Sequence, residues 1–409
     1  MKRILILLPN LPYPLDSGGN QGTYHMINAI KDDYELFLWY LSDFAVDSRL
    51  ESEFMDSIGG KCRVFHTVKR KGINIATMRG IHYKIDSFLL KNNLEFRHNH
   101  MIWGKETSSR FDNYILEDIK TIITDNDIDI VQVEYMELID YVYALPSSVK
   151  KVFIHHELGF VRKKTLLNNL NDKCIYDDFL YKRALSREIS ALNNYELVVA
   201  MTNIDKDKLV EEGVNARIEV SSSYIPLTNK TYPDFGYSSD RLTFIASGVH
   251  YPNVEGLKWF IEKVHPLLVA NIDYKLEVIG SRWRLNSLGG VPRNITFSGF
   301  IECLTDVVPG SVMIVPILSG SGMRMKILES VNNSVPFVST TVGAEGLLFQ
   351  DSRDCYIADT PEMFAKRIEN LLLDKKMQKD FVMNSRSVYE KNYSKDILSK
   401  RRIDVLNVL

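Results

Sequence analysis

Short apolar runs alternate with longer helical patterns along most of this 409-residue chain. Residues 3–8 and 35–40 are two such runs, and residues 21–31 between them have room for a helix. Continuous apolar runs with helices between them are typical of parallel strands covered on both faces. Further runs of this kind occupy 128–133, 151–155 and 196–200. The pattern predicts an α/β fold built on a doubly wound parallel sheet.

A polar segment containing Pro226, Pro233 and Gly236 separates this series from a second one. The apolar runs of the second series lie at 242–246, 276–279, 295–297, 312–316 and 335–338. A chain of this length exceeds what one hydrophobic core usually organises. Two doubly wound domains in tandem place a cleft between the carboxyl ends of their sheets. We predict domains at 1–225 and 241–390, a linker at 226–240, and a helix at 391–409 that packs back on the first domain.

A glycine-rich segment follows the run 312–316 and leads into a helical pattern. Residues 319–329 read Ser-Gly-Ser-Gly-Met-Arg-Met-Lys-Ile-Leu-Glu. A strand, a glycine turn and a helix in this order point free backbone N–H groups at an anion, and Arg324 and Lys326 add two cations. Glu329 offers a carboxylate that can accept both hydroxyl groups of a ribose, although in isolation it could equally be a solvent-facing helix residue. The segment predicts a site for a phosphate ligand with hydroxyls, such as a nucleotide-sugar.

Glycines and titratable residues also end two strands of the first domain. Gly18 and Gly19 open a predicted helix, where they permit close approach to a ligand or form a plain turn. The run 151–155 ends in two histidines and Glu157. Consecutive strand residues point to opposite faces, which disfavours a metal shared by His155 and His156. We therefore predict that His156 faces the cleft and that the site holds no metal.

Two loops of the second domain are weaker candidates for ligand contacts. Ser247 and Asn253 follow the run 242–246, and Asn253 is a suitable N-cap for a helix starting near Val254. Asn253 could equally be an N-cap that contacts no ligand. Gly299 and Phe300 follow the run 295–297, where backbone groups could hold the edge of a nucleobase.

Composition excludes some partners. The chain has 50 basic and 52 acidic residues, a net charge of −2, which gives no general attraction to nucleic acid. The four cysteines are far apart, which indicates reduced thiols in a cytoplasmic protein. Basic residues with apolar neighbours at 69–71 and 78–84 could rest on a membrane surface, although a solvated face is the more ordinary interpretation. The pair His98 and His100 is interpreted as a surface feature.

The residues of the glycine-rich segment carry a family resemblance. The pattern Gly-x-Gly-Met-Arg-x-Lys-x-x-Glu-Ser at 320–330, with Val-Pro-Phe-Val-Ser-Thr at 335–340 and Gly-x-Glu-Gly-Leu at 343–347, resembles the second-domain signature of GT-B-fold, family 4 retaining glycosyltransferases (group 1). The resemblance implies two Rossmann-like domains, the first binding an acceptor and the second a nucleotide-sugar. It implies sugar transfer to a glycan or lipid-linked acceptor with retention and without a metal or other cofactor, in surface polysaccharide synthesis on the cytoplasmic face of a membrane.

The resemblance also implies roles for single residues. Glu329 would bind the ribose, and the turn at Gly322 and Met323 would hold the pyrophosphate together with Arg324 and Lys326. Gly18 and Gly19 would approach the phosphates from the first domain, and His156 would lie near the donor sugar. We therefore expect His156, Arg324 and Lys326 to act in catalysis.

This sequence departs from the family pattern at three positions. Ser321 stands where many members have the first of two glutamates, a residue that usually contacts the donor sugar. Val249 and Glu255 stand where many members have an arginine and a lysine. We expect Arg324 and Lys326 to supply the missing phosphate-binding charge. Two other functions stay open: a nucleotide-sugar epimerase of the same fold and a non-catalytic sugar-binding protein.

Overall fold

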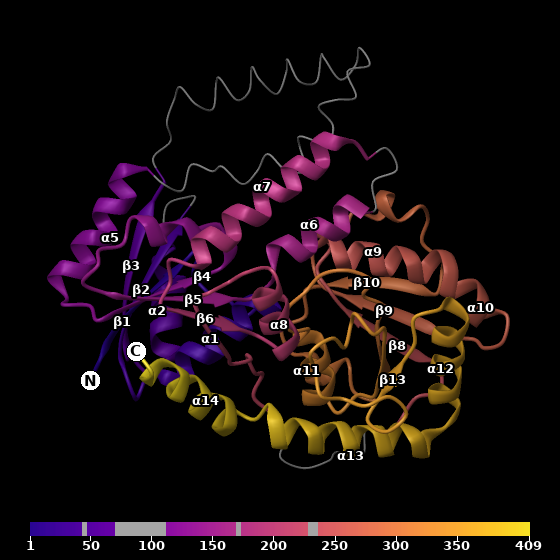
Figure 1. Cartoon of the computed structure of the whole chain (residues 1–409). Coiled ribbons are helices and arrows are strands. Elements are labelled where there is room, and N and C mark those ends of the chain that lie inside the picture. Colours follow the sequence, from indigo (N-terminus) through magenta and orange to yellow (C-terminus); the bar gives the residue numbers. More distant parts are fainter. Residues whose placement is uncertain (43–46, 70–111, 169–172, 228–235) are drawn as a thin grey trace.

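The computed structural model describes residues 1–42, 47–69, 112–168, 173–227 and 236–409 (Figure 1). Most of the basic stretch near 69–84, together with His98 and His100, lies outside these residues, so the predictions for them stay predictions. Figure 1 shows two sheets, one in each half of the molecule, with helices packed around them. The prediction of two doubly wound α/β domains is confirmed.

The strands of the first domain form one parallel sheet in the order β3-β2-β1-β4-β5-β6-β7. The strands are β1 (Arg3–Leu8), β2 (Glu35–Ser42), β3 (Cys62–Val68), β4 (Ile130–Glu134), β5 (Lys150–His155), β6 (Leu197–Ala200) and β7 (Arg217–Val220). The helices are α1 (Gly18–Ile30), α2 (Ser48–Ser57), α5 (Asn113–Asp125), the 3-10 helix η2 (Met136–Tyr143), α6 (Gly159–Asn168), α7 (Ile175–Leu192) and α8 (Asn203–Glu211).

The second domain repeats the design with the order β10-β9-β8-β11-β12-β13, again parallel. The strands are β8 (Arg241–Ile245), β9 (Lys275–Ile279), β10 (Ile295–Gly299), β11 (Val312–Val315), β12 (Phe337–Ser339) and β13 (Tyr356–Ile357). The helical elements are α9 (Tyr251–Trp259), η3 (Phe260–Val264), α10 (His265–Val269), η4 (Leu285–Leu288), η5 (Leu304–Asp306), α11 (Met325–Asn332) and α12 (Pro361–Leu373).

The strand orders locate the crevice of each sheet. The chain proceeds from β1 outward to β2 and β3, then returns and continues from β4 in the opposite direction. The second sheet reverses in the same way between β8 and β11. Ligands of open α/β sheets bind at such reversal points, outside the carboxyl ends of the strands. The helices that follow β1 and β11, namely α1 and α11, begin at these two points and contact each other.

Two terminal helices connect the domains a second time. Helix α13 (Lys375–Asn392) packs on α11, and α14 (Lys395–Asn407) packs on α1 of the first domain. Figure 1 shows the pair running along one side of the molecule, so that the two chain ends lie in the same half. The Tyr34 hydroxyl donates to Asn407 Oδ1 at 2.8 Å, and the buried Arg402 donates to the Ser221 carbonyl at 3.0 Å. The break between the helices falls at Tyr393 and Ser394, slightly beyond the predicted boundary at 390.

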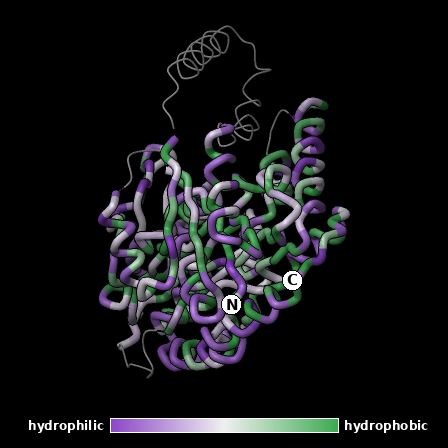
Figure 2. Tube along the Cα trace, turned by 90° about the vertical axis from the view of Figure 1, so that its left-hand side faces the viewer, coloured by the Kyte–Doolittle hydropathy of each residue, from purple (hydrophilic) through white to green (hydrophobic). Residues whose placement is uncertain are grey.

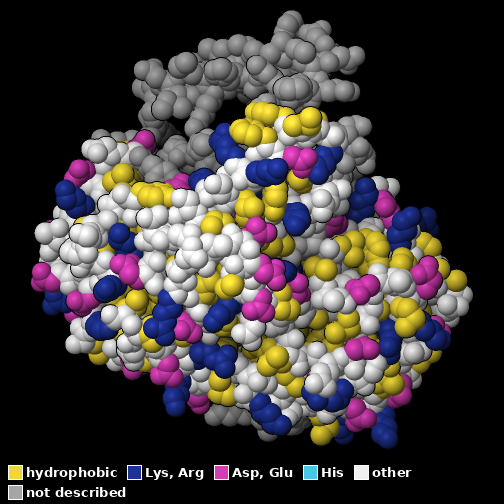
Figure 3. All heavy atoms as spheres, in the orientation of Figure 1, with side chains coloured by type: hydrophobic (Ala, Val, Ile, Leu, Met, Phe, Trp, Pro, Cys, Tyr) yellow, Lys and Arg dark blue, Asp and Glu magenta, His cyan; other side chains and the backbone are white. Residues whose placement is uncertain are grey.

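Apolar side chains fill the space around both sheets. Two clusters cover the faces of the first sheet, and a third occupies the second domain. Figure 2 shows hydrophobic residues running through the interior and hydrophilic residues concentrated on outer coils. Figure 3 shows acidic and basic side chains intermingled on the visible face, which accords with the small net charge. Within the described residues, no helix has the length and apolar character needed to cross a bilayer.

Candidate active site between the two domains

The amino-terminal ends of α1 and α11 meet between the domains. Ser17 caps α1 by accepting a hydrogen bond from the Asn20 N–H at 3.2 Å, so Gly18 and Gly19 form the first turn as predicted. A β-carbon on Gly18 would lie 3.0 Å from Met325 Cβ of α11, and one on Gly19 would lie 3.1 Å from the Tyr135 hydroxyl. The two glycines therefore allow the helix ends to approach closely. Their contact with a ligand stays a prediction.

The glycine-rich turn before α11 is pressed against the first domain. Gly322 has φ +75°, and a β-carbon there would lie 2.1 Å from the His156 carbonyl oxygen, so no other residue fits without displacing backbone. Its N–H donates to Asp205 Oδ1 of α8 at 3.3 Å. Ser321 Oγ accepts a hydrogen bond from the Leu158 N–H at 2.7 Å. A serine at the position of the usual family glutamate thus joins the two domains.

Arg324 folds back over this turn. Its Nη1 donates to the carbonyls of Ser321 and Gly322, the latter at 2.7 Å. Its Nη2 is buried and has no hydrogen-bond partner among the described residues. Burial lowers the pKa of this guanidinium, while Glu157, Glu345 and Asp205 act in the opposite direction. A buried donor without a partner is costly, so Nη2 marks a place where a ligand oxygen would be stabilised.

Lys326 contacts the helix that follows β8. Its Nζ donates to Asn253 Oδ1 at 2.6 Å and lies 5.2 Å from the centre of the Phe244 ring. Burial, with a smaller contribution from the Arg324 cation, lowers the pKa of Lys326 to about 7. The ammonium is therefore only partly charged at neutral pH in the absence of an anion. The structure brings both predicted cations to one helix end.

Glu329 is buried beside α1, with only 7% of the residue exposed. Burial raises the pKa of its carboxyl, which is opposed by hydrogen bonds from Gln21, Asn332 and Asn333. The Asn333 amide lies 3.4 Å from Glu329 Oε2. Polar partners at the domain boundary thus hold the carboxylate, and a ribose would have to replace the contact with Gln21. Ribose binding by Glu329 stays a prediction.

His156 is fixed from two sides. Its Nε2 is hydrogen-bonded to Glu134 Oε2 at the end of β4, and its ring stacks on Tyr135 with centroids 4.2 Å apart. Tyr135 is in turn held by Thr23 of α1, with 2.9 Å between the hydroxyl oxygens. The carboxylate can only accept, so Nε2 carries the proton and Nδ1 is the acceptor in the neutral ring.

His155 points the other way, as expected for consecutive strand residues. It is buried and lies 3.0 Å from Glu188 of α7. The same carboxylate accepts a hydrogen bond from the Gly159 N–H at 3.0 Å. The residues that the structure describes contain no group of three or more His, Cys, Asp and Glu side chains placed to hold a metal ion.

The loops that follow β8 and β10 are placed at the same edge of the second sheet. Asn253 does not cap α9, contrary to the prediction: the helix begins at Tyr251 with His250 as N-cap. The Asn253 side chain instead donates to the Ser247 carbonyl at 2.9 Å while it accepts from Lys326. Pro252 in the first turn explains the earlier start, because proline favours this position. Asn253 therefore holds the Lys326 ammonium in position.

Gly299 ends the edge strand β10 and Phe300 follows it, separated from β11 by β9 and β8. Gly299 has φ +71°, and its carbonyl accepts a hydrogen bond from the Gly280 N–H at 2.7 Å. Phe300 is 51% exposed. An exposed aromatic ring at this edge is compatible with the predicted contact to a base.

Sequence reasoning missed the charged residues that the first domain adds to the cleft. Arg162 of α6 pairs with Glu157 at 3.3 Å, and Asp205 reaches the glycine turn from α8. Burial raises the pKa of Glu157, against the opposing effect of Arg162 and Arg324. Lys208 of α8 pairs with Glu345 of the second domain at 2.9 Å. These residues are scattered along the sequence, and only Glu157, next to His156, carried a local signal.

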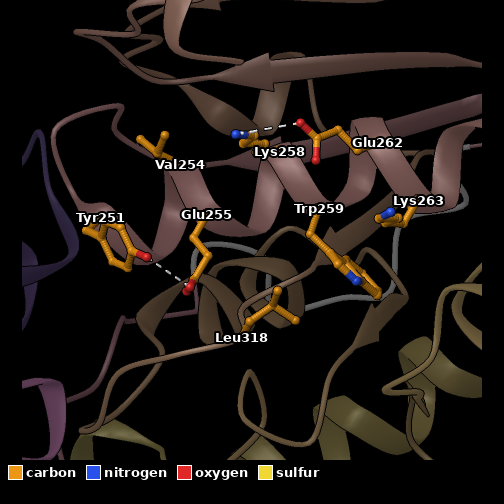
Figure 4. Close-up of a pocket in the computed structure, with 8 residues that line it drawn as sticks. All are labelled: Tyr251, Val254, Glu255, Lys258, Trp259, Glu262, Lys263 and Leu318. Atoms are coloured by element: carbon orange, nitrogen blue, oxygen red, sulfur yellow. Dashed lines mark hydrogen bonds and ion pairs between the residues drawn. The ribbon is translucent and has the colours of Figure 1, made fainter. Parts of the chain in front are cut away.

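Glu255, at a usual lysine position of the family, is hydrogen-bonded to the first residue of the glycine-rich segment and to the first residue of its own helix. Its Oε2 accepts from the Ser319 hydroxyl, and its Oε1 accepts from the Tyr251 hydroxyl at 3.1 Å. It lines a groove of about 320 Å³ on the outer side of α9 (Figure 4). None of the predicted site residues lines this groove, so we place the candidate site at the meeting of α1 and α11.

The chain is similar to known proteins over the second domain and over its whole length. Residues 240–374 match the family model of the glycosyl transferases group 1. A 44.6 kDa protein from the cps region of Klebsiella pneumoniae is 22% identical over 425 aligned residues, which cover 98% of each chain.

Solved structures resemble the whole chain. A variant of S. aureus TarM, determined with fondaparinux, α-GlcNAc-glycerol and UDP, superposes with a TM-score of 0.67 at 11% identity over 100% of both chains. The sucrose-phosphate synthase of Thermosynechococcus elongatus gives 0.70 at 11% identity, covering 100% of this chain and 98% of that one. Anabaena HepE with UDP-glucose gives 0.68 at 11% identity over 100% of both chains. Residues 240–374 thus match the glycosyl transferases group 1 family, and the chain as a whole has the two-domain GT-B fold of these structures.

Proposed function

We propose that the protein transfers a sugar from a nucleoside-diphosphate sugar to a glycan or lipid-linked acceptor, with retention of the anomeric configuration, in the synthesis of a surface polysaccharide. The donor would bind to the second domain and the acceptor to the first. The cps-region relative and the similar structures determined with UDP and with UDP-glucose support this assignment. We further propose that the reaction needs no metal ion.

The glycine turn at the start of α11 carries the proposal. It presents a helix amino terminus, the partnerless Nη2 of Arg324 and the buried Lys326 in one place. Positive charge and free donors at a helix start are suited to a diphosphate. When the bond between the anomeric carbon and the phosphate oxygen breaks, these cations would stabilise the negative charge on the leaving phosphate.

The same arrangement suggests how transfer proceeds. The acceptor hydroxyl oxygen would bond to the anomeric carbon on the face from which the diphosphate departs, and its proton would pass to the leaving phosphate oxygen. His156 would orient the donor sugar through a hydrogen bond at Nδ1, because Glu134 already occupies Nε2. No side chain is required as a covalent nucleophile.

A ligand screen followed by product analysis tests the proposal. Melting temperature is measured with UDP, GDP, ADP and their sugars, since a ligand that binds only the folded state raises it. The donor that binds is then incubated with glycan and lipid-linked acceptors, with and without EDTA, and the anomeric configuration of the product is read by NMR. Failure of every nucleotide to bind would contradict the proposal. Epimer formed from the donor without acceptor would favour the epimerase, and binding without turnover would favour the sugar-binding protein.

A further inference from the structure

The first domain contributes a cation to the proposed diphosphate site. Arg162 lies in the first turn of α6, and its guanidinium Nη1 is 3.3 Å from Glu157 Oε2. Glu157 lies directly opposite the glycine turn, because a β-carbon on Gly322 would be 3.5 Å from Glu157 Cα. The Arg162 side chain is 42% exposed, so solvent and a dissolved ligand can reach it. Through Glu157 it is anchored at the point where the two domains meet.

Arg162 also acts on the loop after β8. The pKa of His250, the N-cap of α9, is lowered to about 4 by desolvation and then by three cations: Lys326, Arg162 and Arg324. Arg162 and Arg324 both act on the carboxyl of Glu157 as well. One cation from the first domain and two from the second therefore act electrostatically on His250, and the two arginines also act on Glu157. His250 itself stays neutral there at pH 7.

The second domain is short of positive charge for a diphosphate by itself. Val249 is exposed and uncharged, and Glu255 faces Ser319. Nη1 of Arg324 donates to a carbonyl of its own turn, and Lys326 is only partly protonated near neutral pH. The acidic groups that face Arg324 are Glu157, Glu345 and Asp205. Two of these carboxylates are paired with cations of the first domain, Glu157 with Arg162 and Glu345 with Lys208, so the first domain places positive charge beside the glycine turn.

We propose that Arg162 binds the diphosphate of the nucleotide-sugar from the first domain, together with Arg324 and Lys326 of the second. This inference rests on the proposed function, because it assigns a further residue to the same donor site. Glu157 holds Arg162 in place in the absence of a donor. A diphosphate that enters the cleft would then be bound by both domains and would draw them together, whereas a nucleoside without phosphates would gain nothing from Arg162.

Titration calorimetry with Arg162→Ala tests the assignment. Inorganic pyrophosphate and UDP, GDP and ADP are the probes, with uridine as the uncharged reference. Loss of a charged hydrogen bond costs about 1.5–3 kcal/mol, so we expect affinity for pyrophosphate and for the recognised nucleoside diphosphate to fall about tenfold or more. Arg162→Lys keeps the charge without the planar fork and should recover part of the loss. Uridine affinity should not change.

Lys164→Ala is the matched control, because Lys164 is an exposed cation on the same helix. We expect wild-type affinities for this variant and unchanged melting temperatures for all ligand-free variants. Equal pyrophosphate and diphosphate affinities in the wild type and in Arg162→Ala would overturn the role of Arg162 while leaving the proposed function intact. If no probe binds the wild type, the proposed function itself fails. If Lys164→Ala lowers the affinity as much as Arg162→Ala does, the loss reflects the general surface charge of the protein. That result would also overturn the assignment.

Discussion

The two walls of the cleft are built in different ways. In the second domain, the groups proposed to bind phosphate belong to one continuous segment, from Gly320 through Glu329. In the first domain, the wall is assembled from the ends of β4 and β5 and from α6 and α8, which lie far apart in the sequence. The second-domain wall can vary only as a unit, because each of its residues belongs to one turn. The first-domain wall can change one residue at a time.

The walls also differ in how their charges are compensated. Arg324 and Lys326 are half-buried, and desolvation lowers the pKa of both. In the first domain, His156 is matched with Glu134 and Arg162 with Glu157. A wall whose cations are partly desolvated gains from binding an anion, whereas a wall of paired groups holds its side chains in fixed orientations. We infer that the second domain supplies most of the donor affinity and the first supplies orientation.

Removing a cation from the second-domain wall should have the largest effect. We expect Lys326→Ala or Arg324→Ala to lower turnover at least about tenfold, the lower end of what loss of a transition-state charge contact costs. Turnover is measured as release of nucleoside diphosphate. Lys258→Ala, on the outer side of α9, is the control and should behave like the wild type. Wild-type rates in both Lys326→Ala and Arg324→Ala would show that the second-domain wall takes no part in the mechanism.

The pKa of Lys326 gives a second test of the same wall. The pKa is about 7 in the ligand-free fold against the ordinary lysine value of 10.5, so the folded state binds fewer protons than the unfolded chain between these limits. The contribution of Lys326 to the free energy of unfolding is therefore most favourable above pH 10.5. It decreases progressively as the pH falls towards 7. A bound diphosphate favours the charged ammonium and raises its pKa again. We expect uptake of up to about one proton per diphosphate near pH 8, and affinity that falls up to tenfold per pH unit above that.

Calorimetry in buffers of different ionisation enthalpy measures this uptake directly. Lys326→Met, which keeps the length and loses the charge, should bind diphosphate more weakly and without the proton. If the wild type and Lys326→Met take up the same number of protons at pH 8, another group is responsible and the assignment to Lys326 is wrong.

The sequence-based predictions succeeded where the determinants were local. The turn and helix at Gly320–Glu329 follow from residues adjacent in the chain, and the apolar runs predicted five strands of each sheet but missed β3, β7 and β13. The capping prediction for Asn253 was wrong because Pro252 shifts the helix start to Tyr251. Glu134, Arg162 and Asp205 could not be predicted, because their positions depend on strand order and on the packing of one domain against the other. No local pattern encodes those relations.

A more modest effect is expected in the first-domain wall. Glu134→Gln leaves a hydrogen-bond acceptor for His156 Nε2 but removes the charge. The difference between charged and neutral hydrogen bonds is about 1 kcal/mol, so kcat should fall about fivefold with little change in KM for the donor. His156→Phe keeps the stacking on Tyr135 and removes both nitrogens, and it should lower kcat further. A change in KM alone would mean that this wall binds the donor rather than orienting it.

The smallest effect should come from Ser321, where the two walls touch. Ser321→Ala removes the acceptor for the Leu158 N–H and should lower the free energy of unfolding by about 1 kcal/mol, measured by denaturant titration. Donor affinity should hardly change, because the serine contacts protein in this arrangement. Ser321→Glu restores the usual family residue, but its carboxylate would have to be buried beside Leu158, so the domains should remain further apart, which small-angle scattering detects. If Ser321→Glu leaves the compact form intact and alters which donor sugar is used, residue 321 reads the sugar directly, and the division between an affinity wall and an orienting wall is wrong at this position.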